Sequence, residues 1–326
     1  MKPPSVFLGL LLLLLLGVLL ALSVGKFSLS VPEVVQALLR QGSENAQTVV
    51  WNVRLPRILA AIVVGAALAA AGVAYQGMFR NPLVAPDILG AAAGAGFGAS
   101  LAILLSLPIL LIQGLAFVGG MLAVGLVYFM AQAVRRHDPV LVLVLTGVAV
   151  GTLFSSGTSL IKVLADPSVQ LPSITFWLMG GLNGVTSKEL PLLTGLVGLG
   201  LIPLILLRWR INLLSLPDEE AASLGVHVGR LRLVLIVAAT LMTSAAVAVT
   251  GIIGWVGLVV PHAARLLVGP ELSRLLPVAM VLGGLFLLVA DTLARTAALI
   301  EIPLGILTAA VGVPVFLALL MRGGRS

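Results

Sequence analysis

Long apolar stretches, each about as long as a bilayer is thick, constrain the fold of this chain more than any other feature. With about 20 apolar residues per crossing, ten stretches qualify: 5–24, 57–77, 88–107, 112–134, 140–164, 190–208, 231–250, 254–268, 275–297 and 304–321. In the bilayer core only helices or closed barrels satisfy every backbone polar group, and these stretches lack the alternating pattern of barrel strands. The sequence therefore predicts an all-α membrane protein with ten transmembrane helices in a single domain, 1–326.

Composition supports this class and excludes others. Only 10% of the residues are charged and 60% are hydrophobic, whereas a soluble domain carries about 25% charged residues. The first stretch is longer than the apolar region of a secretory signal, so we interpret it as a retained helix. The lack of cysteine excludes disulfides and thiolate metal sites. The net charge of +7 requires no nucleic acid as a partner, because membrane proteins gather Lys and Arg in cytoplasmic loops.

The distribution of basic residues predicts the orientation. An even number of crossings puts both termini on one side, and with that side in the cytoplasm 12 of the 19 Lys and Arg residues lie inside. The inner residues are Lys2, Arg80, Arg135, Arg136, Arg208, Arg210, Arg230, Arg232, Arg265, Arg274, Arg322 and Arg325. The outer ones are Lys26, Arg40, Arg54, Arg57, Lys162, Lys188 and Arg295. This excess favours cytoplasmic termini.

Three long motifs carry a resemblance to a known family. They are WNVRLPRILAAIVVGAALAAAGVAYQGMFRNPLVAPDILGAAAGAGFG (51–98), GIIGWVGLVVPHAARLLVG (251–269) and EIPLGILTAAVGVPVFLALLMR (301–322). In this order they resemble the FecCD-type permease subunits of binding-protein-dependent ABC importers for iron chelates, haem and cobalamin. The resemblance implies a type II importer permease fold in a prokaryotic cytoplasmic membrane. It also implies a homodimer with the pathway at its twofold interface, two ATPase subunits and a soluble substrate-binding protein.

An internal repeat is expected within this fold. Spans two to five and seven to ten each hold a small-residue helix followed by a Pro-interrupted segment, NPLVAP in the first set and VVPHAARL in the second. One span separates the two sets, so they would have opposite orientations in the membrane. The sequence thus indicates two weakly related halves of inverted topology.

Arginines at the outer ends of two spans are candidates for docking the binding protein. Arg54 and Arg57 flank Pro56, and Arg295 lies near the end of the ninth span. Arginine can pair bidentately with carboxylates, and the resemblance implies that these three receive acidic residues of the binding protein. The alternative is that they anchor helix ends by snorkelling. Asp291 stands four residues before Arg295, a spacing that favours a structural ion pair between them.

The longest polar cytoplasmic stretch, about 209–230, is predicted to contain a short helix. Pro217 suits a helix start, Asp218, Glu219 and Glu220 complement the helix N-terminus, and Gly225 suits its end. The resemblance implies that this is the coupling helix, which enters a cleft on the ATPase. The assigned residues are Pro217, Asp218, Glu219, Glu220, Ala221, Ala222, Ser223, Leu224 and Gly225. The alternative is an ordinary capped surface helix.

The turn Asn81-Pro82-Leu83 follows the second span at its cytoplasmic end, and Pro82 breaks the helix there. The resemblance implies that this loop helps close the pathway on the cytoplasmic side, whereas the alternative is a plain turn. The fifth span resembles the pore-lining helix through its small and hydroxyl residues, which suit tight helix packing equally well. Those residues are Thr146, Gly147, Gly151, Thr152, Ser155, Ser156 and Ser159.

The chain shows no signature of chemistry of its own. It lacks the GxxxxGK[ST] motif that cradles phosphates, so ATP and Mg²⁺ are expected on a separate ATPase chain. It has no GxSxG elbow, and His262 has no second histidine at metal-ligand spacing. We therefore expect no catalytic residue, no metal site and no cofactor on this chain, which is not an enzyme.

From the resemblance we expect this chain to be the permease subunit of an ATP-driven importer for an iron chelate, either a ferric siderophore or haem. Cobalamin or an oxyanion such as molybdate remains open as the cargo, because the binding protein sets much of the selectivity. An ion-coupled secondary transporter is the alternative from another class, but it should carry membrane-embedded carboxylates for the coupling ion. An intramembrane enzyme would need a buried nucleophile or metal constellation, and the sequence shows neither.

Overall fold

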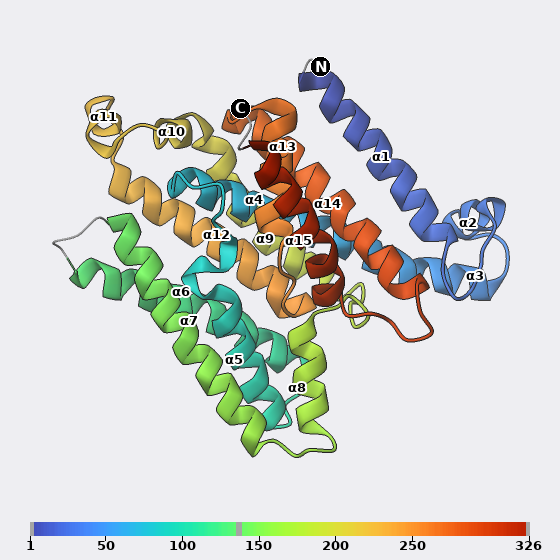
Figure 1. The fold of residues 1–326 in the computed structure, drawn as a ribbon. Coiled ribbons are helices and arrows are strands. Elements are labelled where there is room, and N and C mark those ends of the chain that lie inside the picture. Colours follow the sequence, from blue (N-terminus) through green and yellow to red (C-terminus); the bar gives the residue numbers. More distant parts are fainter. Residues whose placement is uncertain (1–2, 135–138, 324–326) are drawn as a thin grey trace. The chain divides into compact units, whose positions relative to one another are not determined.

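A computed structural model describes residues 3–134 and 139–323, and across these residues the chain is helical with short connections (Figure 1). Six helices are long and apolar enough to cross a membrane, and four shorter apolar helices accompany them among the described residues. All ten coincide in order with the ten predicted spans. They are α1 (Pro3–Ser23), α4 (Leu55–Met78), α5 (Ala91–Leu104), α6 (Ile109–Ala133), α7 (Pro139–Leu164), α9 (Leu190–Leu206), α12 (Val228–Thr250), α13 (Val256–Val268), α14 (Leu272–Thr296) and α15 (Leu304–Gly323). The predicted all-α polytopic fold is confirmed.

Short helices that the hydropathy pattern did not predict fill several connections. They are α2 (Val31–Leu38), α3 (Glu44–Thr48), the π-helical turn η1 (Val49–Arg54), the 3-10 turn η2 (Pro86–Leu89), α8 (Gln170–Met179) and α10 (Arg208–Leu213). Helix α11 (Asp218–Ser223) is the one that local sequence chemistry predicted. Because η1 runs directly into α4, the helical segment Glu44–Met78 is 35 residues long.

Helix α2 begins with a capping box. The backbone N–H of Ser30 donates to the Glu33 carboxylate at 2.7 Å, and Pro32 occupies the first turn. The hydrogen bonds from Ser30 hold the pKa of Glu33 below its ordinary value. Trp51 in η1 donates its indole N–H to the carbonyl of Ala37 at 2.9 Å. These contacts fold the connection between α1 and α4 into a compact cap.

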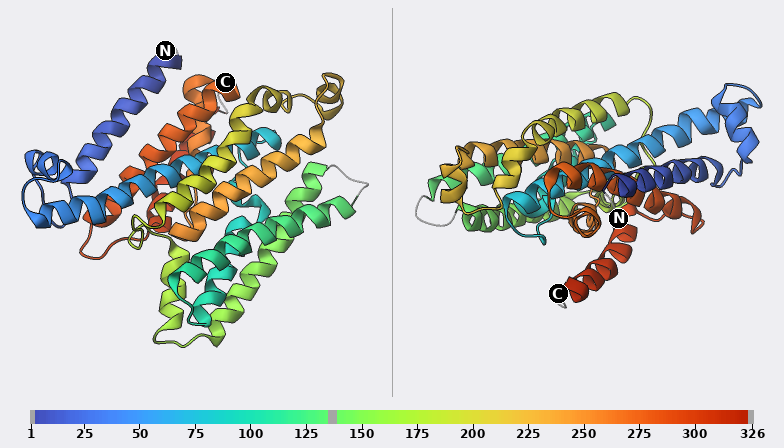
Figure 2. Two further views of the ribbon diagram at one scale, coloured as in Figure 1. Left: turned by 180° about the vertical axis from the view of Figure 1, so that it is seen from behind. Right: turned by 90° about the horizontal axis from the view of Figure 1, so that it is seen from above.

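Contacts divide the chain into two compact units. The first comprises Met1–Val73, Gly181–Gly195 and Ile253–Ser326, and the second comprises Ala74–Gly180 and Leu196–Ile252. In the first unit α14 packs against α1, α13 and α15 (Figure 2). In the second unit α5 packs against α6, α7, α8 and α12. These packing units are not the two predicted halves, since α12 packs with α5 and α6 while residues 55–73 of α4 lie in the first unit. The inverted repeat stays a prediction.

Small residues bring helix backbones together in each unit. In the second unit Gly94 of α5 faces Gly119 of α6 so closely that an added Cβ would collide with the Gly119 carbonyl oxygen. In the first unit Gly65 of α4 and Gly283 of α14 meet in the same way. Helices in lipid gain no hydrophobic advantage from association, so close backbone packing holds them together.

The α5–α6 contact gives a direct stability prediction. Gly94→Ala is expected to destabilise the fold by about 3 kcal/mol or more, because rigid backbone cannot move away from the new methyl group. Gly114→Ala is the matched control on α6, since a Cβ there meets nothing within 4 Å. Thermal unfolding of the purified protein in detergent compares the two. Equal midpoints would show that this backbone contact contributes little.

Candidate functional site

A buried ion cluster in the first unit joins the start of α4 to the end of α14. Arg57, the third residue of α4, donates its Nε to both oxygens of Asp291, at 2.9 and 3.0 Å. Its Nη1 donates to both oxygens of Glu301, at 3.1 and 3.0 Å. The side chain of Asp291 is only 1% exposed, whereas that of Glu301 is 35% exposed. Arg57 therefore holds one carboxylate in the interior and another near the surface.

Two further arginines of this cluster cap the C-terminal end of α1. Arg54 at the end of η1 and Arg295 in the last turn of α14 donate to backbone carbonyls there. The acceptors are the carbonyls of Ala21, Leu22, Ser23, Val24 and Phe27. The last carbonyls of a helix have no partner within the helix, and they carry partial negative charge that attracts cations. Three helix ends thereby meet at one point.

The cluster carries an excess of positive charge around a small cavity. The cavity measures about 240 Å³, and its lining includes four cationic and two acidic side chains: Lys26, Arg54, Arg57, Arg295, Asp291 and Glu301. The three arginines are almost fully buried, at 4%, 9% and 8% exposure for Arg54, Arg57 and Arg295. Lys26 reaches the carbonyl of Leu299 at 2.9 Å. An anionic group entering this cavity would meet a net positive field.

The structure brings together the three arginines that the sequence singled out, but it changes their partners. Asp291 and Arg295 do lie within ion-pair distance, at 3.8 Å, as their spacing indicated. The closer partner of Asp291 is Arg57, which is 234 residues away in the chain and was not foreseen. Glu301 is the first residue of the third motif, 301–322, and its pairing with Arg57 was not foreseen either. The docking role of the three arginines stays a prediction.

The predicted short helix in the long polar stretch is present as α11. Pro217 precedes it, and three acidic residues fill its first turn. At its end Gly225 has φ +83°, its N–H donates to the Ala222 carbonyl at 2.9 Å, and the N–H of Val226 reaches the Ala221 carbonyl at 3.2 Å. This pair of bonds is a Schellman motif, which requires a left-handed residue at the position of Gly225.

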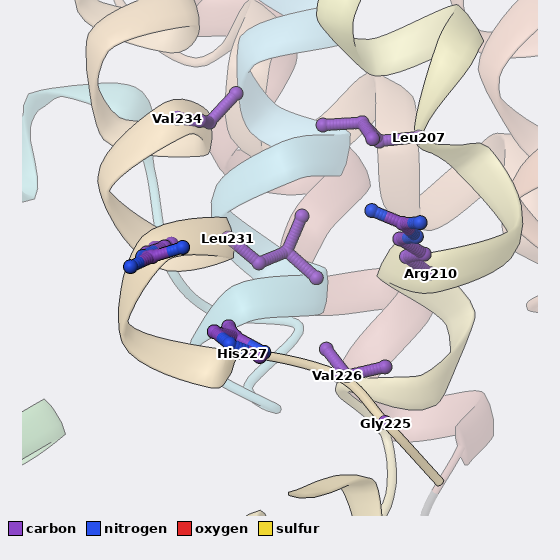
Figure 3. A pocket seen from close by; sticks show the side chains of 8 residues that line it. Leu207, Arg210, Gly225, Val226, His227, Leu231 and Val234 are labelled. Atoms are coloured by element: carbon purple, nitrogen blue, oxygen red, sulfur yellow. The ribbon is translucent and has the colours of Figure 1, made fainter.

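A second cavity lies beside the end of α11, between α10 and the start of α12 (Figure 3). Its volume is about 350 Å³. Arg210, His227 and Arg230 line it together with apolar residues, and its full lining is Leu207, Arg210, Gly225, Val226, His227, Arg230, Leu231 and Val234. The backbone turn at Gly225 forms one edge of this hollow.

The turn after α4 is tightly hydrogen-bonded and exposed. The side chain of Asn81 accepts the N–H of Leu83 at 2.9 Å, and its carbonyl accepts the N–H of Val84 at 3.4 Å. Pro82 stands at the second position of this β-turn, where its fixed φ is favourable. Gln76 on α4 donates its side-chain amide to the Val84 carbonyl at 3.3 Å. Leu83 is 48% exposed at the tip.

The polar face of α7 separates into a packing part and an open part. Gly147 is a packing residue, because a Cβ there would collide with the carbonyl of Ile88. Thr152, Ser155 and Ser156 are exposed and line a hollow of about 430 Å³. Among the described residues that line this hollow, Asp87 is the one with an ionisable side chain. The lining is Asp87, Ile88, Gly90, Ala93, Gly147, Val148, Gly151, Thr152, Ser155, Ser156 and Ser159.

Metal ligands are not grouped in the part of the chain that the structure describes. Within residues 3–134 and 139–323, no three His, Cys, Asp or Glu side chains lie together so that they could hold a metal ion. His262 lies in α13, and His137 falls outside the described residues.

The apolar helices are long enough to cross a membrane, and a short polar helix lies between two of them, as in a multi-pass membrane protein. The chain belongs to the FecCD transport family, whose sequence profile matches residues 12–322. It is therefore a permease subunit of ABC importers and not an enzyme. Such permeases work with ATPase and binding-protein partners.

Individual relatives share most of their length with this chain. It is 40% identical over 333 residues to the molybdate import system permease MolB of Haemophilus influenzae, covering 99% of this chain and 98% of the other. It is 40% identical to the hemin transport system permease HmuU of Yersinia pestis, covering 98% and 96%. A structure described as an inward-facing metal-chelate type ABC transporter matches with a TM-score of 0.91 at 39% identity, covering 98% of this chain and 99% of that one. The type II importer permease fold is thus shared over the whole chain.

Proposed function

We propose that this chain moves an iron chelate, a ferric siderophore or haem, into the cytoplasm of a prokaryote, driven by ATP hydrolysis on a partner. Relatives named for hemin and iron chelatin transport support this cargo. The observation that carries the proposal is the open face of α7, where hydroxyl and small residues surround a single carboxylate, that of Asp87. A large, partly apolar chelate can pass such a surface without charged ligands.

An oxyanion is the second candidate cargo, because the relative named for molybdate import is 40% identical to this chain and is aligned with it over 98% of its own length. Cobalamin is a third, since the cobalamin import permease of Halobacterium salinarum is 43% identical over 278 residues. Asp87 is the one acidic side chain in the described lining of the α7 hollow, and its carboxylate disfavours an oxyanion because like charges repel. It does not oppose a chelate that carries little net charge.

The orientation and assembly of the importer follow from the same features. Helix α4 has 24 residues and is about 36 Å long, so its two ends reach opposite faces of a bilayer. We place the arginine cluster outside, with α11, the 81–83 turn and both termini in the cytoplasm, and we treat 1–326 as one permease domain.

Two copies form a homodimer with the α7 face along its twofold pathway. Two ATPases, which hold ATP and Mg²⁺, bind α11, and the 81–83 turn closes the inner end.

The arginine cluster is proposed to receive carboxylates of the binding protein. The guanidinium groups of Arg54, Arg57 and Arg295 are already bonded within the chain, so docking has to exchange partners. Of the two carboxylates that pair with Arg57, Glu301 is the exposed one, at 35% against 1% for Asp291. An incoming carboxylate can take its place without disturbing Asp291 beneath. Charge-assisted bidentate bonds of this kind supply both orientation and strength.

Neutralising Glu301 is therefore expected to strengthen docking. Glu301→Gln should tighten binding of the binding protein by about three- to tenfold at low salt, because it frees Arg57 and removes a repelling charge. Binding to the permease in nanodiscs, measured by biolayer interferometry at several salt concentrations, tests this. Glu44→Gln is the matched control, with the same loss of charge outside the cavity. Weaker or unchanged binding in Glu301→Gln would contradict the exchange.

The function is tested by ATPase stimulation. The permease with its ATPase in nanodiscs should hydrolyse ATP faster when the binding protein carries a ferric siderophore or haem. Transport that persists without the ATPase and collapses with the proton or sodium gradient would instead indicate a secondary transporter. Stimulation by molybdate-loaded binding protein alone would replace the iron chelate with an oxyanion.

A further inference from the structure

A three-residue ion cluster in the second unit joins α11 to the turn after α4. Asp218, the first residue of α11, accepts a hydrogen bond from Nη2 of Arg232 in α12 at 2.9 Å on Oδ1, and its Oδ2 lies 2.8 Å from Nη1 of the same guanidinium as an ion pair. The same carboxylate pairs with Arg80, which is 138 residues earlier in the chain. One side chain on α11 thus bonds to two other elements.

Arg80 contacts α11 and the segment that leads into it. Besides the ion pair with Asp218, its Nε donates to the carbonyl of Leu214 at 2.7 Å. Its backbone has φ +51°, a left-handed conformation that is unfavourable for a residue with a side chain. The N–H of Arg80 donates to the Gly77 carbonyl at 3.3 Å and that of Asn81 to the Gln76 carbonyl at 3.2 Å, so a Schellman turn at the end of α4 holds this backbone. The two side-chain contacts of Arg80 then join this turn to α11.

The turn that follows Arg80 is hydrogen-bonded within itself and to the last turns of α4. Asn81 directly follows Arg80, and its N–H donates to the Gln76 carbonyl at 3.2 Å. The side chain of Asn81 fixes Leu83, and that of Gln76 fixes Val84. We therefore expect displacement of Arg80 to move this turn, including its exposed tip at Leu83.

Arg232 supplies the fixed side of the cluster. Its side chain is 9% exposed, whereas those of Asp218 and Arg80 are 41% and 37% exposed. A bidentate pair with one buried partner resists separation more than a pair between two exposed side chains does. Asp218 therefore ties α11 to the start of α12, so we expect these two elements to move together and Arg80 to follow them.

We propose that Asp218 is the positioning residue that transmits movement of α11 to the turn 81–83 through Arg80. The inference deepens the proposed function, on which it rests, because it assumes that α11 moves with the ATPase and that the turn is the inner gate. In this role Asp218 acts within the permease, because its carboxylate pairs with Arg80 and Arg232 of the same chain. The other two acidic residues of the first turn, Glu219 and Glu220, stay available to the ATPase.

A single cysteine at the tip of the turn reports its movement, because the chain has no cysteine of its own. In the permease–ATPase complex in nanodiscs, Leu83→Cys is labelled with a membrane-impermeant maleimide in the nucleotide-free and the vanadate-trapped states. We expect the labelling rate to differ by about fivefold or more between the states. With Asp218→Asn added, the difference should fall below about twofold.

Three further variants test whether the effect of Asp218→Asn comes from the lost ion pair with Arg80. Arg80→Gln should cause the same loss while leaving the acidic first turn of α11 intact, which covers the case that Asp218→Asn fails to fold. Asp218→Glu should restore part of the response. Glu271→Gln breaks an exposed ion pair with Arg274 and should leave the response unchanged.

The outcomes distinguish the proposed link from Asp218 to Arg80 from the proposed gate at 81–83, on which it rests. A full response in Asp218→Asn or in Arg80→Gln would overturn the link. Equal losses in Asp218→Asn and Glu219→Gln would show that the charge at the start of α11 matters rather than the two arginines, and would also overturn it. Lack of any nucleotide response with Asp218 intact would instead refute the gate at 81–83, and the link with it.

Discussion

Replacing Asp291 by alanine is expected to lower the free energy of unfolding by about 3–5 kcal/mol, the usual cost of breaking a buried ion pair by removing one partner. The Asp291 side chain is 1% exposed, and it is the one carboxylate within ion-pair distance of both Arg57 and Arg295 among the described residues. Its loss leaves Arg57 with Glu301 alone and Arg295 with backbone carbonyls only. Thermal and chemical unfolding of the purified permease in detergent measures the change.

Two comparisons make this prediction specific. Glu301→Ala should cost much less, because the Glu301 side chain is 35% exposed and water can replace it. The double variant Arg57→Met/Asp291→Leu should recover part of the loss, since it removes both charges together. Equal destabilisation by Asp291→Ala and Glu301→Ala would contradict the central position given to Asp291.

Gly225→Val is expected to uncouple ATP hydrolysis from transport, with uptake reduced about tenfold or more while ATP hydrolysis continues. No atom lies within 4 Å of an added Cβ at this position, so lack of space is not the cause. The cause is the φ of +83°, a conformation that costs a β-branched residue about 1–2 kcal/mol. The strain should open the Schellman turn and loosen the end of α11. Uptake and ATPase rates measured on the same proteoliposomes give the ratio directly.

Gly225→Asn is the matched control, because asparagine tolerates the left-handed conformation and fits the open space. It should retain most of the coupling. Equal uncoupling by valine and asparagine would show that the bare backbone of glycine, and not its conformation, is what α11 requires.

The crossing helices could be predicted from the sequence because length and hydropathy determine them locally. The predicted span 140–164 corresponds to α7 at Pro139–Leu164, and 231–250 corresponds to α12 at Val228–Thr250. Helix α11 was predicted for a similar reason, since Pro217, the acidic first turn and Gly225 act within a few residues of one another. Helix α2 could have been found from the spacing of Ser30 and Glu33, which is that of a capping box.

The ion clusters could not be derived in the same way, because their partners are far apart in the chain. Local spacing indicated Arg295 as the partner of Asp291, but Arg57 is closer in the folded chain. The pairing of Asp218 with Arg80 likewise has no local signal. Helix spacing identifies neighbours within one helix only, so contacts between helices require the fold.

Uptake by proteoliposomes that contain the permease, its ATPase and its binding protein tests the central claim most directly. Haem, a ferric siderophore, cobalamin and molybdate are offered separately, with and without internal ATP. The account predicts accumulation of haem or the ferric siderophore only when ATP and the binding protein are both present. Accumulation without ATP would contradict the importer mechanism, and ATP-dependent accumulation of molybdate or cobalamin alone would contradict the iron-chelate cargo.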